Sequence, residues 1–342
     1  MSLSPTLSVT LGNLRYDTHA VELLACLEPL PRGNSVRISL PAAVRFEAAP
    51  GDDASMDVDG GEGSKKLFTG KVRTVRRDFR RIHVMLADAA TDLAAYRPCQ
   101  TFEKQNAKQV IRTLASDAGI DVGDVDVDLD VPAYVAQPGR TAAEQIAELA
   151  RLCGAIALVD AEGKLQVIAR PSGQPSAALL YGREILDYSS SNNETINPQR
   201  FAIGFGPAGS SSAPDALRPS LDFLPSSAAA GGAGIVRYPL PLLRTPTAAD
   251  DVSTALQTAN AARAQRLRAR CFLLPALRPG DVIEVQSLPD GLAGGPWLLT
   301  RVQHELRPGV GGATIIEAEG ADTSSLLSGL LGAGLSALGG LL

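Results

Sequence analysis

The sequence predicts an α+β protein that is mostly β, with a small α/β insert and one long helix. Glycine (33 residues) and proline (23) are abundant and aromatic residues make up only 4%, which favours short strands and turns over a helix bundle. Apolar and polar residues alternate in the first and last thirds. We divide the chain into a first β region (1–100), an α/β insert (101–172), a second β region with a helix at 246–270 (173–322) and a Leu/Gly-rich tail (323–342).

The first β region contains several alternating segments. Within residues 35–40, Val36, Ile38 and Leu40 share one face, which is the pattern of a half-buried strand. Residues 51–64 are acidic, rich in glycine and poor in large apolar groups, so we interpret them as a mobile hairpin tip. The remaining expected strands lie at residues 7–11, 19–27, 44–48, 67–75 and 81–87, with a turn near Arg77 and Asp78.

The insert carries two helices with clear start signals. Asn106 and Gln109 resemble a capping pair, and Thr141 and Glu144 match a capping box. Each helix ends at a glycine that suits a left-handed C-terminal cap. Those glycines are Gly119 and Gly154, and a hairpin with strands at 155–159 and 165–169 is expected next.

The second β region is interrupted by the longest expected helix. Thr245 is its N-cap and Pro246 its first residue, while Arg263, Arg266, Arg268 and Arg270 crowd its expected end. Residues 207–233 are rich in Pro, Ser, Ala and Gly and are expected to form a long loop. Strands are expected within residues 185–190, 200–206, 236–240, 277–285, 295–302 and 313–319.

The last 17 residues contain only Leu, Gly, Ala and Ser, with leucines at helical spacing. As a helix they would reach roughly 25 Å, slightly short of a bilayer core. Their five glycines weaken a helix by about 1 kcal/mol each. A segment that orders against a protein partner, a membrane span and a frayed tail all remain open for this stretch.

The composition argues against nucleic-acid binding, metal binding and catalysis. The net charge of −5 disfavours a dedicated nucleic-acid binder. No cysteine pair has zinc or redox spacing, so we expect buried free thiols in a reducing compartment. Only three histidines exist, and no nucleophile has an evident base. We therefore expect no catalytic residue, no metal and no cofactor. The four cysteines are Cys26, Cys99, Cys153 and Cys271.

Two ligand motifs fail on inspection. Residues 204–209 match G-x-G-x-x-G, but no helix pattern follows them, so a dinucleotide site is not expected. Aspartates alternate with apolar residues from Asp124 to Asp130, yet the calcium-loop glycine and glutamate are replaced by Leu129 and Val135. The alternation instead predicts a strand with one solvated face.

A basic cluster surrounds the turn expected near residue 78. A nucleic-acid surface would interleave several aromatic residues with these charges, and Phe79 is the only one. We interpret the segment as a solvated or subunit-contacting hairpin. Its basic residues are Lys71, Arg73, Arg76, Arg77, Arg80 and Arg81.

The order of short motifs along residues 5–320 is more specific than any one of them. In this order the chain resembles the late control gene D family of phage tail proteins, the central baseplate hubs of contractile tails. It is also similar to the hub half of the VgrG spike proteins of type VI secretion. The match is weaker at residues 142–146, where the family often has an Asp and an aromatic residue. The motifs are LFTGKV (67–72), the capped helix ending in AGI (118–120), the helix 141–154, GKL (163–165), LYG (180–182), ILDYS (185–189) and LRPGDVI (277–283).

The resemblance implies two similar β-barrels per chain and a homotrimeric ring that adapts a sixfold tail tube to a threefold spike. The implied partners are the tail tube, spike and baseplate wedge proteins, with assembly in the bacterial cytoplasm and no membrane contact. The spike would be a separate protein, and the tail could connect to it. Our interface candidates are Lys71, Arg73, Arg77, Arg80, Leu277, Asp281, Ile283, Leu327, Leu331, Leu335 and Leu338.

Two other functions compete with a structural hub. A spike-associated cell-wall hydrolase or effector would need a catalytic constellation that the sequence does not show. A membrane-tip or cargo adaptor would act through the C-terminal tail. Deleting residues 323–342 separates this adaptor from the hub, because a connector tail predicts that the ring survives and that spike attachment fails.

Overall fold

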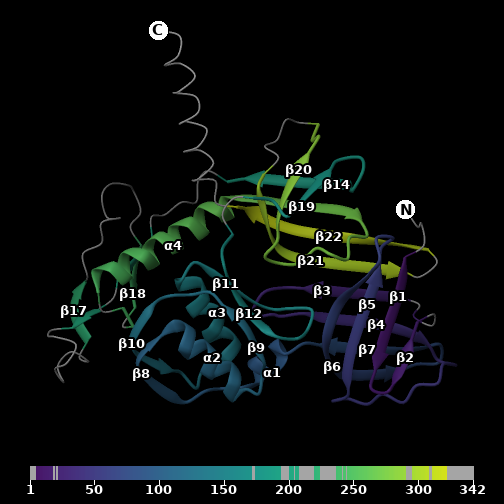
Figure 1. Cartoon of the computed structure of the whole chain (residues 1–342), viewed down its shortest axis with the longest axis horizontal. Coiled ribbons are helices and arrows are strands. Elements are labelled where there is room, and N and C mark those ends of the chain that lie inside the picture. Colours follow the sequence, from purple (N-terminus) through teal and green to yellow (C-terminus); the bar gives the residue numbers. More distant parts are fainter. Residues whose placement is uncertain are drawn as a thin grey trace, which may run out of the picture.

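A computed structural model of the chain describes residues 5–17, 20, 22–171, 174–193, 200–203, 205–207, 219–223, 236–240, 242–243, 245–289, 295–307 and 310–321. The described part is dominated by strands, with four helices (Figure 1). The Leu/Gly-rich tail, most of the expected loop 207–233 and the ends of the G-x-G-x-x-G motif lie outside these residues.

One antiparallel-dominated sheet of 13 strands runs through both β regions. Its order is β14-β19-β22-β21-β3-β4-β7-β6-β5-β1-β2, with β20 also paired to β21 and β13 paired to β20. The strands from the first region are β1 (Thr6–Leu11), β2 (Leu14–Tyr16), β3 (Glu22–Leu27), β4 (Ser35–Pro41), β5 (Asp53–Asp59), β6 (Ser64–Arg77) and β7 (Arg81–Ala87). Those from the second are β13 (Ala177–Leu180), β14 (Ile185–Asn192), β19 (Gln265–Phe272), β20 (Val282–Gln286), β21 (Trp297–Arg307) and β22 (Gly311–Gly320).

The two β regions meet where β3 pairs antiparallel with β21, placing Leu27 opposite Val302 and Leu23 opposite Leu306. A strand has only two hydrogen-bonding edges, and β3 uses its other edge for β4. The expectation of two separate barrels therefore differs from what the described strands form, which is a single sheet with no closed ring of pairs. The mostly β fold class is confirmed.

The acidic segment 51–64 is only in part a hairpin tip: residues 53–59 form strand β5, and residues 60–63 turn the chain into the antiparallel β6. Ala54, Met56 and Val58 are buried, while Asp53, Asp57 and Asp59, which alternate with them, are more exposed. This alternation places β5 between β1 and β6. Residues 44–48, expected as a strand, are irregular, and Phe46 packs there against the Tyr16 ring at 6.2 Å.

The long helix ends earlier than expected. α4 spans Pro246–Ala264, with Thr245 as its N-cap, and the chain then continues directly as β19. The arginines after residue 264 belong to that strand, because Leu267, Ala269 and Cys271 between them are buried at a period of two. The predicted end at residue 270 was therefore wrong. The expected loop 207–233 also contains a strand, β17 (Pro219–Phe223), which pairs with β16 (Phe205–Pro207); β15 (Arg200–Ile203) pairs with β18 (Val236–Pro239).

The insert forms a second core beside the sheet and beneath α4 (Figure 1). Both predicted capping boxes are present, and Gly119 and Gly154 adopt positive φ. The acidic alternation is a strand only as far as Val125, although its apolar residues stay buried throughout. The insert elements are α1 (Ala90–Ala95), β8 (Gln100–Asn106), α2 (Ala107–Asp117), β9 (Val122–Val125), β10 (Asp130–Ala136), α3 (Ala142–Leu152), β11 (Ala155–Val159) and β12 (Leu165–Ala169).

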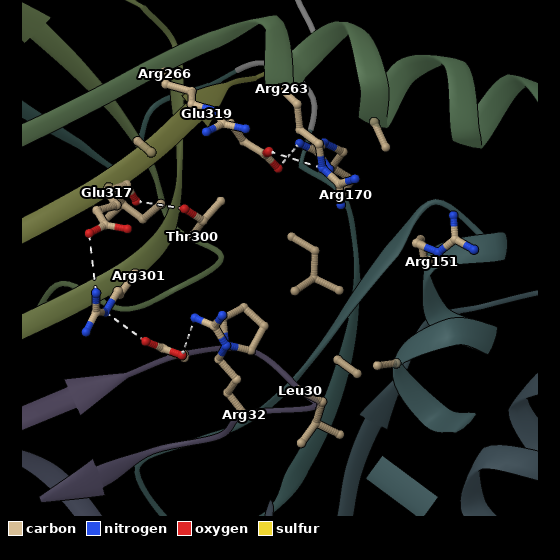
Figure 2. Close-up of a pocket in the computed structure, with 18 of the residues that line it drawn as sticks. Leu30, Arg32, Arg151, Arg170, Arg263, Arg266, Thr300, Arg301, Glu317 and Glu319 are labelled. Atoms are coloured by element: carbon tan, nitrogen blue, oxygen red, sulfur yellow. Dashed lines mark hydrogen bonds and ion pairs between the residues drawn. The ribbon is translucent and has the colours of Figure 1, made fainter. Parts of the chain in front are cut away.

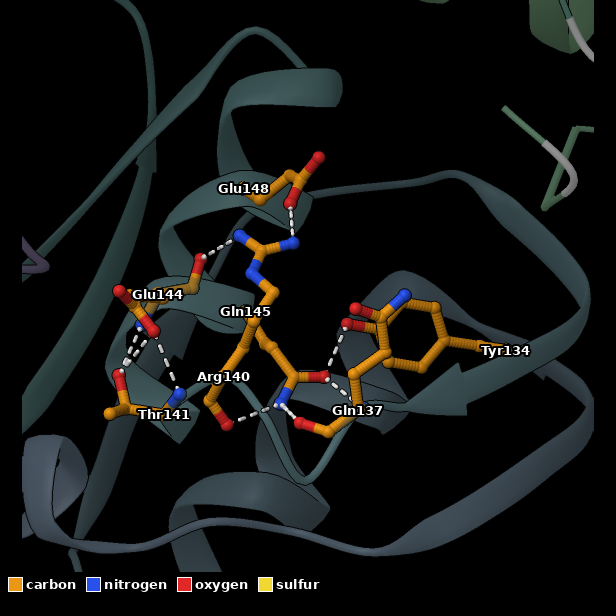
Figure 3. A network of polar contacts seen from close by, with 7 residues as sticks. All are labelled: Tyr134, Gln137, Arg140, Thr141, Glu144, Gln145 and Glu148. Carbon is orange, nitrogen blue, oxygen red and sulfur yellow. Dashed lines mark hydrogen bonds and ion pairs between the residues drawn. The ribbon is translucent and has the colours of Figure 1, made fainter. Parts of the chain in front are cut away.

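A buried amide locks the loop between β10 and α3 (Figure 3). Gln145 is 1% exposed, and its Nε2 donates to the carbonyls of Gln137 at 3.2 Å and Arg140 at 3.1 Å. Its Oε1 accepts from the Tyr134 hydroxyl at 3.0 Å and from the Gln137 amide at 3.1 Å. All four hydrogen-bonding positions of the amide are therefore used.

Candidate interaction surfaces

The β6–β7 hairpin ends in a rigid, exposed tip. The Asp78 carboxylate accepts from the backbone amides of Arg80 and Arg81, each at 2.8 Å, and lies 3.0 Å from the His83 Nε2. These bonds, led by the two backbone amides, lower the pKa of Asp78 to about 2. The next residue, Phe79, is 94% exposed. The ring of Phe79 is therefore held at the solvent-facing end of the hairpin.

The four basic residues predicted to mark this surface fall into two groups. Lys71 and Arg80 are exposed. Arg73 instead forms a 2.8 Å ion pair with Asp92 of α1, so it holds the hairpin base to the insert. Arg77 lies over the Phe46 ring at 5.3 Å and donates to the Phe46 carbonyl at 3.2 Å. The surface on offer to a partner is therefore the hairpin tip and its rim.

The candidates in the strand region 277–285 are mostly internal. Leu277 is 6% exposed and Ile283 is fully buried, because both face the main core. Asp281 accepts from the Arg278 amide at 2.7 Å, and burial raises the pKa of its carboxyl. The burial of Leu277 and Ile283 thus corrects our expectation of a contact surface at these two residues, while Asp281 is partly buried and stays a prediction. The candidate tail leucines Leu327, Leu331, Leu335 and Leu338 lie outside the described residues.

A pocket of about 1130 Å³ opens where the insert, the end of α4 and the sheet meet (Figure 2). The β3–β4 connection forms one side, and one face of α3 with the start of β11 forms another. The remaining walls come from strands β14, β19, β21 and β22. Eight arginines and five glutamates line it, as follows: Arg32, Arg140, Arg151, Arg170, Arg263, Arg266, Arg268, Arg301, Glu28, Glu144, Glu148, Glu317 and Glu319.

Some of these charged side chains are paired with one another. Arg301 lies 2.7 Å from Glu28 and 3.4 Å from Glu317, which ties β21 to the β3–β4 connection and to β22. Glu319 pairs with Arg170 and lies 3.8 Å from Arg263. Both glutamates of β22 are therefore already engaged with cations from other elements.

Three pocket arginines have no hydrogen bond or ion pair within the described part of the chain: Arg151 on α3, and Arg266 and Arg268 on β19. Our sequence reasoning missed this site because it placed the β19 arginines on a helix. The alternation of arginine with Leu267 and Ala269 was the signal for a strand.

The described residues offer little reactive chemistry. They contain no group of three or more His, Cys, Asp and Glu placed to hold a metal ion. Burial raises the pKa of the Cys153 and Cys271 thiols to about 12, which keeps them protonated and unreactive. Cys99 is exposed, contrary to the expected burial of all four cysteines. None of the described helices is both long and apolar enough to cross a membrane.

Comparison with known families decides the identity. Residues 35–309 match the family described as phage tail baseplate hub (GPD), which is well over half of the chain. The chain belongs to the phage tail baseplate hub family. This confirms the resemblance drawn from the order of the sequence motifs. The hub family is structural and not enzymatic, so the chain is a structural component of a phage-type tail baseplate.

Solved structures show the same fold at low identity. The 43 kDa tail protein of prophage MuSo2 from Shewanella oneidensis is 14% identical, with a TM-score of 0.67 over 92% of this hub chain and 98% of that one. A tail protein from Neisseria meningitidis MC58 is 13% identical, with a TM-score of 0.69 over 92% and 96%. An E. coli component of the type VI secretion system is 11% identical, with a TM-score of 0.62 over 92% and 77%. A search of curated protein sequences found no match.

Proposed function

We propose that the chain assembles as a homotrimeric ring that adapts the sixfold tail tube to the threefold spike. Membership of the baseplate hub family supports this proposal. So does the fold shared with the type VI secretion component, which is described as structurally similar to the T4 tail proteins gp27 and gp5. Assembly takes place in the bacterial cytoplasm, before the baseplate joins the rest of the tail.

The observation that carries the proposal is the Phe79 tip on the β6–β7 hairpin. A 94% exposed aromatic ring, held by Asp78 and flanked by Arg80, would be an aggregation hazard on an isolated monomer. The arginine rim favours a partner surface that is apolar at its centre and acidic around it. We assign this tip, with Arg80, to the contact with the tail tube or a baseplate wedge protein. Lys71 lies opposite Ala87 at the other end of the β6–β7 ladder and is proposed as a separate contact.

The Leu/Gly-rich tail, with Leu327, Leu331, Leu335 and Leu338, is proposed as the connector to a separate spike protein. A chain truncated after residue 322 should still form the ring but should no longer retain the spike. If the truncated chain retains the spike, the tail is not the connector, and a cargo or membrane-tip role for it should then be tested.

Sedimentation velocity of the purified full chain tests the trimer. The expected species has three times the 35.6 kDa mass of one chain. Co-expression with the tail tube and spike proteins, followed by affinity purification of the hub, tests the adaptor role. A chain that stays monomeric at high concentration and retains neither protein would overturn the proposal.

A further inference from the structure

We propose that the ring is closed by a charge-complementary contact in which the aspartate row of one protomer docks on the arginine row of the next. The aspartate row is Asp124, Asp126, Asp128 and Asp130 of the insert. The arginine row is Arg266, Arg268 and Arg270 of β19, with Arg151 at its border. This inference rests on the proposed trimer and names the surfaces that build it.

The arginine row is an exposed cationic stripe whose guanidinium groups form no ion pair with a described residue. Arg266, Arg268 and Arg270 are exposed on one face of β19, at every second residue. Their cross-strand neighbours on β22 include Glu319 and Glu317, but those carboxylates pair with Arg170, Arg263 and Arg301 instead. Within the described residues, the three guanidinium groups of the stripe therefore form no hydrogen bond or ion pair, and Arg270 lies opposite Asp187 of β14 in the strand register.

The aspartate row has the matching spacing and the opposite charge. Its four carboxylates are exposed, while Val125, Val127 and Leu129 between them are buried. Alternate residues of an extended segment lie about 7 Å apart, and so do alternate residues of β19. None of these carboxylates forms a hydrogen bond or an ion pair with a described residue.

The other alternating acidic segment, β5, is a poorer occupant. Its Asp53 lies opposite Lys71 and its Asp57 opposite Lys66 in the register with β6, so lysines of the same sheet already lie beside these carboxylates. The aspartate row of the insert has no such lysine ladder. Its carboxylates are therefore the better candidates for pairing with cations of a neighbouring molecule.

The two rows lie on different parts of the molecule, so they must meet between molecules. β19 continues directly from the end of α4 into the large sheet, whereas β9 and β10, which flank the aspartate row, lie in the insert (Figure 1). A contact between two different patches of identical chains is head-to-tail, and such contacts close into a ring when the rotation allows it.

The pocket gives the aspartate row a place to seat. Arg151, Arg266 and Arg268 line its wall, and Ser189 to Ser191 of β14 supply hydroxyl groups beside them. Its volume of about 1130 Å³ is at the upper end for a small-ligand site, which suits an inserted chain segment.

Charge reversal in the full chain tests the contact. D126R/D128R and R266D/R268D should each lower the trimer fraction at least tenfold in sedimentation velocity at low salt. The four-residue swap that combines both pairs should restore it, because opposite charges then face each other again. The control E62R/E103R reverses two exposed carboxylates outside the row and should leave the trimer unchanged. Circular dichroism and the Tm of each variant confirm that it folds.

The outcomes separate the two proposals. Trimers that persist in both reversal variants would overturn the charge-row contact and leave the trimeric hub intact. Loss of trimer in both variants without rescue by the four-residue swap would also overturn the pairing of these rows. A wild-type chain that is monomeric under all conditions would overturn the trimer itself, and this contact with it.

Discussion

The Arg278 guanidinium donates from Nη2 to the backbone carbonyl of Lys66 over 2.7 Å, a contact between residues 212 positions apart. Its Nη1 also donates to the carbonyls of Pro275 and Leu277, at 2.8 and 3.0 Å. Burial lowers the pKa of this arginine, although Asp281 nearby favours its charged form. One side chain thus ties the 277–285 turn of the second β region to β6 of the first.

We predict that R278Q lowers the free energy of unfolding by about 2–4 kcal/mol, because three carbonyls, two of them partly buried, lose charge-assisted hydrogen bonds. R80Q is the matched control on the exposed hairpin tip and should change stability by less than about 0.5 kcal/mol. Urea unfolding measures both. Similar values for the two variants would show that the Arg278 contacts contribute little.

Replacement of Gly70 by alanine should destabilise the sheet by more than about 2 kcal/mol. A Cβ at Gly70 would lie 2.4 Å from the Ala87 carbonyl oxygen and 2.6 Å from the Phe68 ring, so backbone has to move. Gly139, where a Cβ meets nothing within 4 Å, provides the control G139A. Thermal unfolding of both variants checks the difference, and an unchanged Tm for G70A would contradict it.

His304 should make the free energy of unfolding decrease as the pH is lowered. The ring is fully buried, and burial together with nearby Arg278 lowers the pKa of His304 to about 3, against about 6.5 in the unfolded chain. Between these values the unfolded state binds more protons, so the free energy of unfolding decreases by about 1.4 kcal/mol per pH unit as pH falls from 6.5 towards 3.

The variant H304Q should remove this contribution, so its loss of stability between pH 7 and pH 5 should be smaller than that of the wild type. H83Q replaces a half-exposed histidine on the hairpin and is the control. Urea unfolding at the two pH values gives the comparison. Equal pH dependence in wild type and H304Q would refute the assignment.

The Gln145 amide should be one of the most sensitive positions of the insert. Q145M keeps the length of the side chain but leaves the carbonyls of Gln137 and Arg140, the Tyr134 hydroxyl and one backbone amide without their partner. We expect a loss of about 2–4 kcal/mol. Q109M, which removes only an exposed capping contact, should lose about 1 kcal/mol or less.

Phe79 should affect binding and not stability. F79S removes a ring that makes almost no contact within the chain, so the free energy of unfolding should change by less than about 0.5 kcal/mol. Retention of the tail tube or wedge protein in co-purification should fall markedly. M85S, on the same hairpin but 39% exposed, compares a second apolar side chain. Unaltered retention by F79S would remove the hairpin tip from the proposed interface.

Local features of the fold could be predicted wherever the signal was local. The capping boxes at Asn106 and Thr141 specify helix starts through hydrogen bonds to residues three positions away, and both are present. The β5 segment was missed because its aspartates outweighed the buried Ala54, Met56 and Val58 in our interpretation. The end of α4 was misplaced for the opposite reason: the arginines suited a helix C-terminus, while the alternation that begins at Gln265 indicated a strand.

The sequence by itself therefore determined the mostly β class, the capped helices of the insert and, through the order of its motifs, the baseplate hub family. The tertiary structure alone decided that β3 pairs with β21 and that Arg73 forms an ion pair with Asp92. It also decided that Arg151 and Arg266 line the same pocket. The physical reason is that every strand edge offers the same backbone donors and acceptors, so a local pattern does not specify its distant partner. Side chains far apart in the chain meet only after that pairing is made.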